Sequence, residues 1–321
     1  QIGRGSSRLG PLVIDNVVFY SPSVGTSVRT IGYDFAIDGL KSNDVTIFSP
    51  HFFEGHGIVS WCYSQEPRSL IWAARDDGKL VCFTWEQEQN VWGWTLCETD
   101  GLVKSVCSIT ENGEERVYLL LDRIVEGVTR RFVERMASHS WSDVADTCFM
   151  DCAVSGVFDP AQRTFTGLWH LEGRTDVVAL VDGMALTGLT VTNGAVTLPE
   201  TAADATKATF GIPYQVDVET LPVRMNTQSF GSNIGRRQQV GEIALILADT
   251  RSIEAGIDAD HLFPVKSRAA EGYGEPDALM NGEYTVTTDN KAGNNASVHI
   301  RQTLPLPLTI LGIAADPIVN G

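Results

Sequence analysis

Two groups of side chains in the first third of the chain are of types that could do chemistry. Asp76 and Asp77 are adjacent carboxylates, which a glycosidase might use, and His51, Glu54 and His56 offer the nitrogen and oxygen atoms that bind metals. Neighbouring carboxylates at a hairpin tip point in different directions, and a metal site needs three or four ligands. We therefore expect a solvated turn and hydrogen-bonded loop anchors, and we predict no catalytic, cofactor-binding or metal-binding residues.

Four tryptophans, Trp72, Trp85, Trp92 and Trp94, alternate along runs that are expected to pair as strands. Exposed indole rings could bind the faces of sugars, but packing in the core of a sheet is the ordinary explanation. The sequence contains no Gly-x-Ser-x-Gly elbow, no Walker loop, no His-Glu-x-x-His motif and no glycine-rich dinucleotide fingerprint. We therefore expect neither an enzyme nor a cofactor.

The six cysteines all lie in the first half of the chain, and four of them fall inside apolar, strand-like runs. A free thiol in such a run behaves as a small buried hydrophobe. The sequence has no Cys-x-x-Cys pair, and His139 and His170 are poorly spaced to complete a zinc site with Cys148 and Cys152. Reduced, buried cysteines are expected, with a disulfide between Cys148 and Cys152 as the alternative.

The elements that must position these residues are short strands joined by tight turns. Between Ser69 and Met136 six apolar runs follow one another: Leu70–Ala74, Leu80–Trp85, Val91–Cys97, Val103–Ile109, Val117–Leu121 and Arg131–Met136. The junctions include Asp-Gly and Asn-Gly pairs, which suit hairpins because glycine accepts a positive φ without a Cβ clash. This spacing predicts an antiparallel meander.

The residues before this stretch predict more sheet of the same kind. Strands are expected over Leu12–Tyr20, Val28–Phe35, Val45–Phe48 and Ile58–Tyr63, with turns at 38–40 and 42–44. If Val17–Tyr20, Leu70–Ala74 and Val117–Leu121 are equivalent, the repeat is about 46 to 53 residues, close to the four-stranded blade of a β-propeller. The chain has no initiator methionine, and we expect it to be a fragment of a longer protein.

The sequence after Met136 predicts two further β regions. Residues 153–223 are rich in Thr, Val and Gly and predict an inserted small β-barrel or sandwich, with a hairpin turn at Asn193-Gly194 as its clearest local signal. Residues 224–321 return to longer strands and to the main body, and residues 1–152 carry the propeller-like blades. The predicted strands after residue 153 are Phe165–Leu168, Val177–Val181, Leu189–Thr192, Ala195–Leu198, Ala208–Pro213, Tyr214–Glu219, Arg236–Asp249, Leu262–Ser267, Gly282–Thr288, Ala296–Gln302 and Leu308–Ala314.

Composition and charge limit the possible functions. Hydrophobic residues make up 43% and charged residues 20% of the 321, and no apolar run approaches the roughly 20 residues that cross a bilayer. The net charge is −16, and it is spread: 13 basic and 21 acidic residues up to Cys152, then 11 and 19, give −8 in each part. This charge argues against a protein that binds nucleic-acid phosphates, which needs clustered Lys and Arg. The ordinary role of an evenly acidic surface is solubility, and the alternative is a surface that repels phosphates and lets DNA pass unbound.

Several segments resemble a family of phage structural proteins, the tail nozzle or tail tubular (stabilisation) proteins of short-tailed phages, over the C-terminal half of a typical member. The segments that carry this resemblance are Ser49–His56, Gln65–Pro67, Trp72–Leu80, Phe83–Trp94, Gly127–Met136, His170–Arg174, Gly211–Tyr214 and Leu306–Ile313. They are structural signatures, so they indicate the family and not the role of any residue.

The resemblance implies a virion tail component, made in the host cytoplasm, that forms a homo-oligomeric ring, usually a hexamer, below the portal and adaptor. Its partners would be other copies of itself, adaptor or portal-associated proteins and tail fibres, with genomic DNA passing through the channel unbound and no insertion into a membrane. Loops at Met225–Asn233 and Ala270–Asn281 are candidates for subunit contacts or a channel gate. The alternatives are a tail-associated carbohydrate-binding or depolymerising module, or a capsid-decorating or adaptor protein without channel contact.

Overall fold

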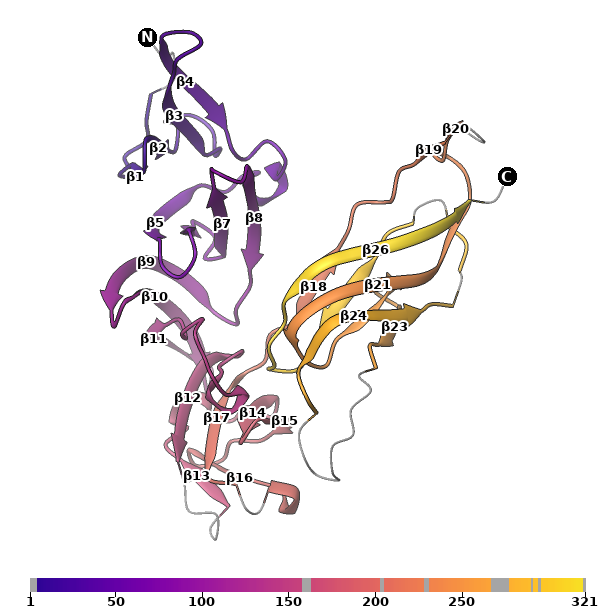
Figure 1. The fold of residues 1–321 in the computed structure, drawn as a ribbon. Helices are drawn as coiled ribbons and strands as arrows, with labels where there is room; N and C mark the ends of the chain where they lie inside the picture. The colour runs from indigo at the N-terminus through magenta and orange to yellow at the C-terminus, as the bar shows by residue number, and fades with distance from the viewer. Residues whose placement is uncertain are drawn as a thin grey trace. The chain divides into compact units, whose positions relative to one another are not determined.

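The computed structural model describes residues 5–157, 163–202, 205–227, 231–266, 277–289, 291–293 and 296–319. Over these residues the fold is all-β, as the sequence predicts, and its helical segments are short 3-10 turns (Figure 1). The chain forms two compact units, residues 1–140 and 141–321. In the described part of the chain, no helix has the length and apolarity needed to span a membrane.

Three consecutive antiparallel sheets build the first unit (Figure 1). The first sheet contains β1 (Leu12–Ile14), β2 (Val17–Tyr20), β3 (Arg29–Asp34) and β4 (Gly39–Asp44). A 3-10 turn, η1 (Pro50–Phe52), leads to the second, which contains β5 (Ile58–Ser64), β6 (Leu70–Arg75), β7 (Leu80–Glu86) and β8 (Val91–Cys97). The third contains β9 (Leu102–Glu111), β10 (Glu114–Val125) and β11 (Val128–Arg135).

All six strands predicted between Ser69 and Met136 are confirmed, but they form two meanders and not one, because β8 ends the second sheet and β9 begins the third. The turn chemistry explains why. Asn112 and Gly113, at the hairpin between β9 and β10, have φ of 53° and 82°, and Glu126 and Gly127, between β10 and β11, have φ of 51° and 75°. Two successive positive φ values match the right-handed twist of the flanking strands.

The second sheet is buried on both faces. Along β6 side chains alternate, so Ile71 and Ala73 join a core with Phe19 of β2, while Trp72 and Ala74 join another core with Leu121 of β10. The three sheets are therefore stacked face to face. The runs expected to be equivalent, in β2, β6 and β10, are each the second strand of their sheet, so the predicted repeat is correct in these three places.

Two predictions near the N-terminus are wrong. The run Leu12–Tyr20 is two strands, because a turn at Asp15, with φ of 51°, folds β2 back on β1. Val45–Phe48 is bend and turn, and the preceding polar segment, expected as a turn at 42–44, is part of β4. Pairing with β3 decides this, since the Arg29 guanidinium donates to Ser42 Oγ at 3.1 Å and Asp44 Oδ2 at 3.2 Å.

The second unit begins with a small β region that has its own core. Its strands are β12 (Asp151–Val157), β13 (Thr164–Thr166), β14 (Val177–Val181), β15 (Met184–Leu189), β16 (Ala195–Thr197) and β17 (Lys207–Ile212), with 3-10 turns η2 (Val144–Asp146), η3 (Trp169–Leu171) and η4 (Glu200–Ala202). One sheet has the order β12-β17-β14-β15, and β13 pairs with β16. Both contribute to one core, and neither sheet closes into a barrel within the described residues.

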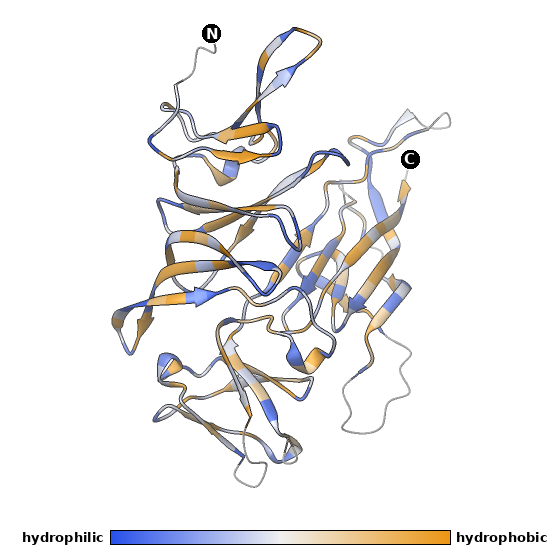
Figure 2. Cartoon of the chain, turned by 60° about the vertical axis from the view of Figure 1, so that its left-hand side comes forward, coloured by the Kyte–Doolittle hydropathy of each residue, from blue (hydrophilic) through white to orange (hydrophobic). Residues whose placement is uncertain are grey.

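The last part of the chain forms two sheets that share one core and, apart from them, a two-stranded pair. Its strands are β18 (Val216–Glu219), β19 (Asn226–Thr227), β20 (Gly231–Ser232), β21 (Gln238–Thr250), β22 (Glu254–Asp258), β23 (His261–Pro264), β24 (Met280–Thr287), β25 (His299–Gln302) and β26 (Ile310–Val319). The order is β18-β25-β22-β23 in one sheet and β24-β21-β26 in the other. Leu245 of β21 and Ile300 of β25 are fully buried between them. Figure 2 shows hydrophobic and hydrophilic segments on the strands of both units.

Most strands predicted here begin within three residues of the expected position. The run Leu189–Thr192 was expected as a strand, but the strand is β15, which begins five residues earlier. Strands β12, β19, β20 and β22 were not expected. The Asn193-Gly194 turn is confirmed by φ of 55° and 65° and by a bridge between Thr192 and Ala195. The predicted loops at Met225–Asn233 and Ala270–Asn281 and the end of Leu262–Ser267 lie partly outside the described residues.

Candidate functional site

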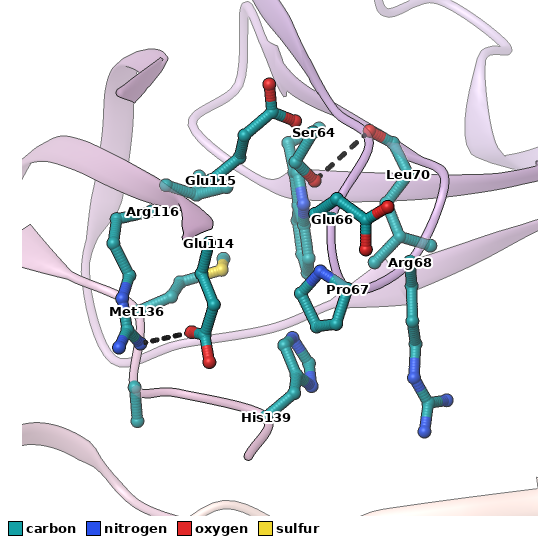
Figure 3. A pocket seen from close by; sticks show the side chains of 13 residues that line it. Ser64, Glu66, Pro67, Arg68, Leu70, Glu114, Glu115, Arg116, Met136 and His139 are labelled. Atoms are coloured by element: carbon teal, nitrogen blue, oxygen red, sulfur yellow. Dashed lines mark hydrogen bonds and ion pairs between the residues drawn. The ribbon is translucent and has the colours of Figure 1, made fainter. Parts of the chain in front are cut away.

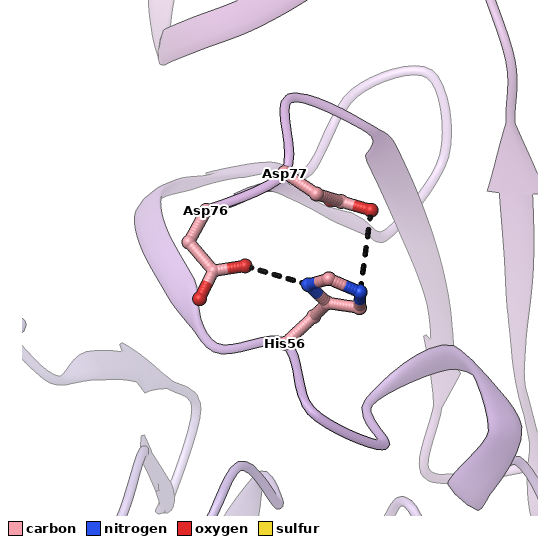
Figure 4. A group of neighbouring side chains, drawn as sticks. All are labelled: His56, Asp76 and Asp77. Carbon is pink, nitrogen blue, oxygen red and sulfur yellow. Dashed lines mark hydrogen bonds and ion pairs between the residues drawn. The ribbon is translucent and has the colours of Figure 1, made fainter.

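The structure brings His56, Asp76 and Asp77 together at one end of the second sheet (Figure 4). His56 Nδ1 lies 3.0 Å from Asp76 Oδ1, and His56 Nε2 lies 3.8 Å from Asp77 Oδ2. The histidine comes from the loop before β5, and the two carboxylates come from the turn between β6 and β7. All three side chains are partly exposed to solvent.

This grouping differs from the one expected from the sequence. His51 and Glu54, which seemed the natural neighbours of His56, do not join it: the His51 ring packs on Phe52 with centroids 4.1 Å apart, and the Glu54 side chain is exposed. Asp76 and Asp77 form the expected turn, but they are bound to the histidine and not merely solvated. Strand register could have revealed this, because pairing Ile58 with Arg75 places the residues just outside that pair side by side.

Buried Arg75 fixes the position of Asp77. Its guanidinium, 6% exposed, donates to both oxygens of Asp77, with Nε 3.0 Å from Oδ1, and Nη1 lies 2.5 Å from the Phe52 carbonyl oxygen. The Lys79 backbone N–H also donates to Asp77 Oδ1, at 3.3 Å. Asp77 therefore neutralises a buried cation, as such burial requires.

The electrostatics of the two carboxyls follow from these donors. The Gly57 backbone N–H, 3.2 Å from Asp76 Oδ2, and His56 lower the pKa of Asp76. The hydrogen bonds from Arg75 lower the pKa of Asp77. A glycosidase acid needs a raised pKa to carry a proton at neutral pH, so this pair does not have the properties of the acid and nucleophile of such an enzyme.

The same donors bear on metal binding. One ligand atom from each of the three residues lies within 4.8 Å of the others. However, the oxygens of Asp77 are bound by Arg75 and Lys79, Asp76 Oδ2 is bound by Gly57, and the two ring nitrogens of His56 face different carboxylates. A metal needs three or four ligands directed at one point. We interpret the cluster as a structural contact that holds the loop before β5 against the β6–β7 turn.

A second polar group lines a small cavity beside the loop between β5 and β6 (Figure 3). Glu114 pairs with Arg116 at 3.1 Å and accepts from Ser138 Oγ at 2.8 Å. Burial, and then the charge of Arg68, lowers the pKa of His139, which keeps its imidazole neutral. The cavity has about 20 Å³, room for a single water molecule and not for an organic substrate.

The tryptophans and cysteines mostly behave as the sequence predicts. Trp72, Trp85 and Trp94 are buried, but Trp92 is 46% exposed. Cys62, Cys82, Cys107 and Cys148 are free thiols, so no disulfide joins Cys148 to Cys152, and burial raises the pKa of Cys62 to about 12. Cys62, Cys82 and Cys152 are buried as predicted, whereas Cys97 and Cys148 are half-buried and Cys107 is exposed on β9. A buried thiol with a high pKa is a poor nucleophile.

Comparison with known proteins adds no assignment: no family model matches this chain, and no curated protein matches it.

Proposed function

We propose that this chain is a structural virion protein, a subunit of a ring in the tail nozzle of a short-tailed phage. The observation that carries the proposal is the face-to-face stacking of three consecutive antiparallel sheets in residues 12–135, with β6 buried on both faces. Propellers also consist of antiparallel meanders packed face to face, and their strand edges are short and protected. The sequence resemblance to nozzle proteins points to the same class.

The polar clusters support a role in scaffolding and not in catalysis. His56, Asp76 and Asp77 hold a loop on a turn, and the cavity beside the β5–β6 loop is too small for a substrate. In the third sheet, the buried Arg123 is bound through Nε and Nη2 by Glu134 at 2.6 and 2.8 Å, which joins β10 to β11. In these described clusters the charged groups are bound to one another and join neighbouring strands and loops.

The net charge of −16 fits a wall past which a genome moves. Phosphates are repelled by acidic surfaces, so DNA would pass through the ring without specific binding. In this proposal the partners are other copies of the chain, adaptor or portal-associated proteins and tail fibres, and the protein is located in the virion tail after synthesis in the host cytoplasm.

The proposal is tested by the mass of the assembly in solution. A ring needs two different patches on each subunit, whose angle decides how many copies close it. For a chain of 34.9 kDa, mass photometry should reveal a discrete closed species of roughly 209 kDa, six copies of 34.9 kDa. A chain that stays monomeric at every concentration would contradict the proposal.

A further inference from the structure

The first unit contains a groove that neither the proposed ring nor the His56 cluster uses. It has a volume of about 320 Å³ and lies between the first sheet, at β2, β3 and β4, and residues Trp85 and Gln87 at the end of β7. Ligand sites for small organic molecules begin at about this size. A groove of this volume holds one or two sugar rings.

Strand register explains why the groove is polar. Thr30, Gly32 and Asp34 alternate along β3 and share one face. Gly32 pairs with Lys41 and Thr30 pairs with Asn43, so these β4 residues lie on the same face. On β2 the side chains of this face, Val17 and Phe19, are apolar and belong to the core. Toward β4 the same face carries the Lys41 ammonium, the Asp34 carboxylate and the Asn43 amide.

Three amide side chains around the groove have no hydrogen bond to the described protein. They belong to Asn16, in the turn after β1, Asn43 and Gln87, and all three are exposed. A side-chain amide donates hydrogen bonds through its nitrogen and accepts them through its oxygen. Each of the three can therefore donate to a sugar hydroxyl or accept from it. Asp34 Oδ2 and Lys41 Nζ, 3.5 Å apart, add an acceptor and a donor whose charges cancel.

Three aromatic residues, Tyr33, Phe35 and Trp85, are among those that border the groove. Alternation along β3 places the Tyr33 side chain on the face opposite Gly32 and Asp34, so Tyr33 borders the groove through its backbone. Tyr33 and Phe35 meet edge to face with centroids 4.9 Å apart, and Phe35 is 90% exposed. Trp85 is only 9% exposed, and its buried indole N–H has no acceptor among the described residues. A buried donor without a partner is costly, which marks this part of the lining as unusual. The Trp85 ring beside the amide groups suits an apolar C–H face and the hydroxyl edges of a sugar.

We propose that this groove binds a neutral saccharide of one or two sugar residues, with the amides of Asn16, Asn43 and Gln87 on its hydroxyls. Among the described lining residues, Asp34 supplies the one carboxylate. Glycoside hydrolysis needs two carboxyl groups, so the groove is expected to bind a saccharide without cleaving it. This goes beyond the proposed ring, whose assembly does not depend on the groove.

Gly32 offers a way to block the groove without strain. Its φ does not lie in the left-handed region, and a Cβ at this position would meet Asn16 O and Val17 Cγ2 at 3.8 Å, which is ordinary contact. Gly32→Leu therefore places a large side chain in the groove and leaves the backbone as it is. Gly93→Leu is the matched control, because Gly93 is also a strand glycine without positive φ and a Cβ there meets nothing within 4 Å.

In the experiment, glucose, galactose, N-acetylglucosamine and their disaccharides are titrated into the full chain. Calorimetry and tryptophan fluorescence measure the binding. Glucuronate and N-acetylneuraminate form the anionic arm. We expect saturable binding of at least one neutral sugar with a Kd on the order of 1 mM, given so small a ligand. Gly32→Leu should weaken binding at least tenfold, and Gly93→Leu should leave it unchanged.

Asn43→Ala and Gln87→Ala change exposed side chains that have no hydrogen bond to the described protein. Each should weaken binding several-fold, which keeps the proposal testable if Gly32→Leu fails to fold. No saturable binding of any neutral sugar up to about 50 mM, far above the expected Kd, would overturn the proposal. So would equal binding by wild type, Asn43→Ala and Gln87→Ala, or binding confined to the anionic sugars. None of these results would bear on ring assembly, which mass photometry reads separately.

Discussion

Arg75 and Asp77 form a two-point ion pair across the start of the β6–β7 turn, and the arginine is 6% exposed while the carboxylate reaches solvent. The same guanidinium donates to the Phe52 carbonyl, so one buried cation ties together a turn and the loop that carries η1. His56 adds a link from that loop to Asp76. This relationship predicts how the second sheet responds to mutation.

Removing the carboxylate should destabilise the first unit. Asp77→Ala leaves the buried Arg75 charge without its partner, and we expect a loss of about 1–3 kcal/mol in the free energy of unfolding, less than for a fully buried pair because Asp77 is partly exposed. Urea denaturation followed by tryptophan fluorescence measures it. Glu88→Ala, at an exposed hairpin residue, is the control and should change stability by less than about 0.5 kcal/mol. Equal stability of the two variants would contradict the role given to Arg75.

Acid should weaken the second unit through Asp217. Burial raises the pKa of this carboxyl, but hydrogen bonds from His299, Gln215 and Arg301 outweigh burial and lower the pKa to about 2. A carboxyl whose pKa is lower in the folded state stabilises the fold above its unfolded pKa, about 3.9, and this contribution is lost as pH falls to about 2. The Tm of the wild type should therefore drop in this window, and Asp217→Asn should flatten the pH dependence while Asp260→Asn should not. A wild-type-like pH profile for Asp217→Asn would refute this assignment.

Replacing a buried phenylalanine should cost much more stability than replacing an exposed one. Phe83 is fully buried where the first two sheets meet, with its ring 6.1 Å from Phe19, whereas Phe48 is 87% exposed in the turn after β4. Phe83→Ala should cost about 3–5 kcal/mol, through lost burial and a cavity, and Phe48→Ala should cost less than about 0.5 kcal/mol. Thermal unfolding of the two variants tests this. Comparable losses would mean that the sheets do not stack on Phe83.

Thiol reactivity should follow burial. Cys107 is exposed, so it should react first with a disulfide reagent in the native protein, and Cys107→Ser should remove the fast phase. Cys62 and Cys82 are buried, and burial raises the pKa of both, so they should react only after unfolding. The time course is measured by the absorbance of the thiolate that the reagent releases. Rapid labelling of Cys62 in the native state would show that the core between the second and third sheets is open.

The sequence predicts the strands well where turn chemistry bounds them. Asn112-Gly113 and Asn193-Gly194 adopt the positive φ values that such pairs favour, and the strands from β6 to β11 follow. Val45–Phe48 was misassigned because local apolar character ignores the pairing of the polar β4 with β3. His56 and Asp76 are 20 residues apart, so their contact depends on strand register, and the groove at Gly32 depends on a contact between sheets that no local pattern carries.

The central claim, a subunit of the tail nozzle ring, is tested most directly by a cryo-EM map of the intact particle. The account predicts density that fits the three stacked sheets of residues 12–135, repeated with sixfold symmetry around the genome exit channel below the portal and adaptor. Density for this chain as a single copy away from that channel, or its absence from purified particles, would contradict the account.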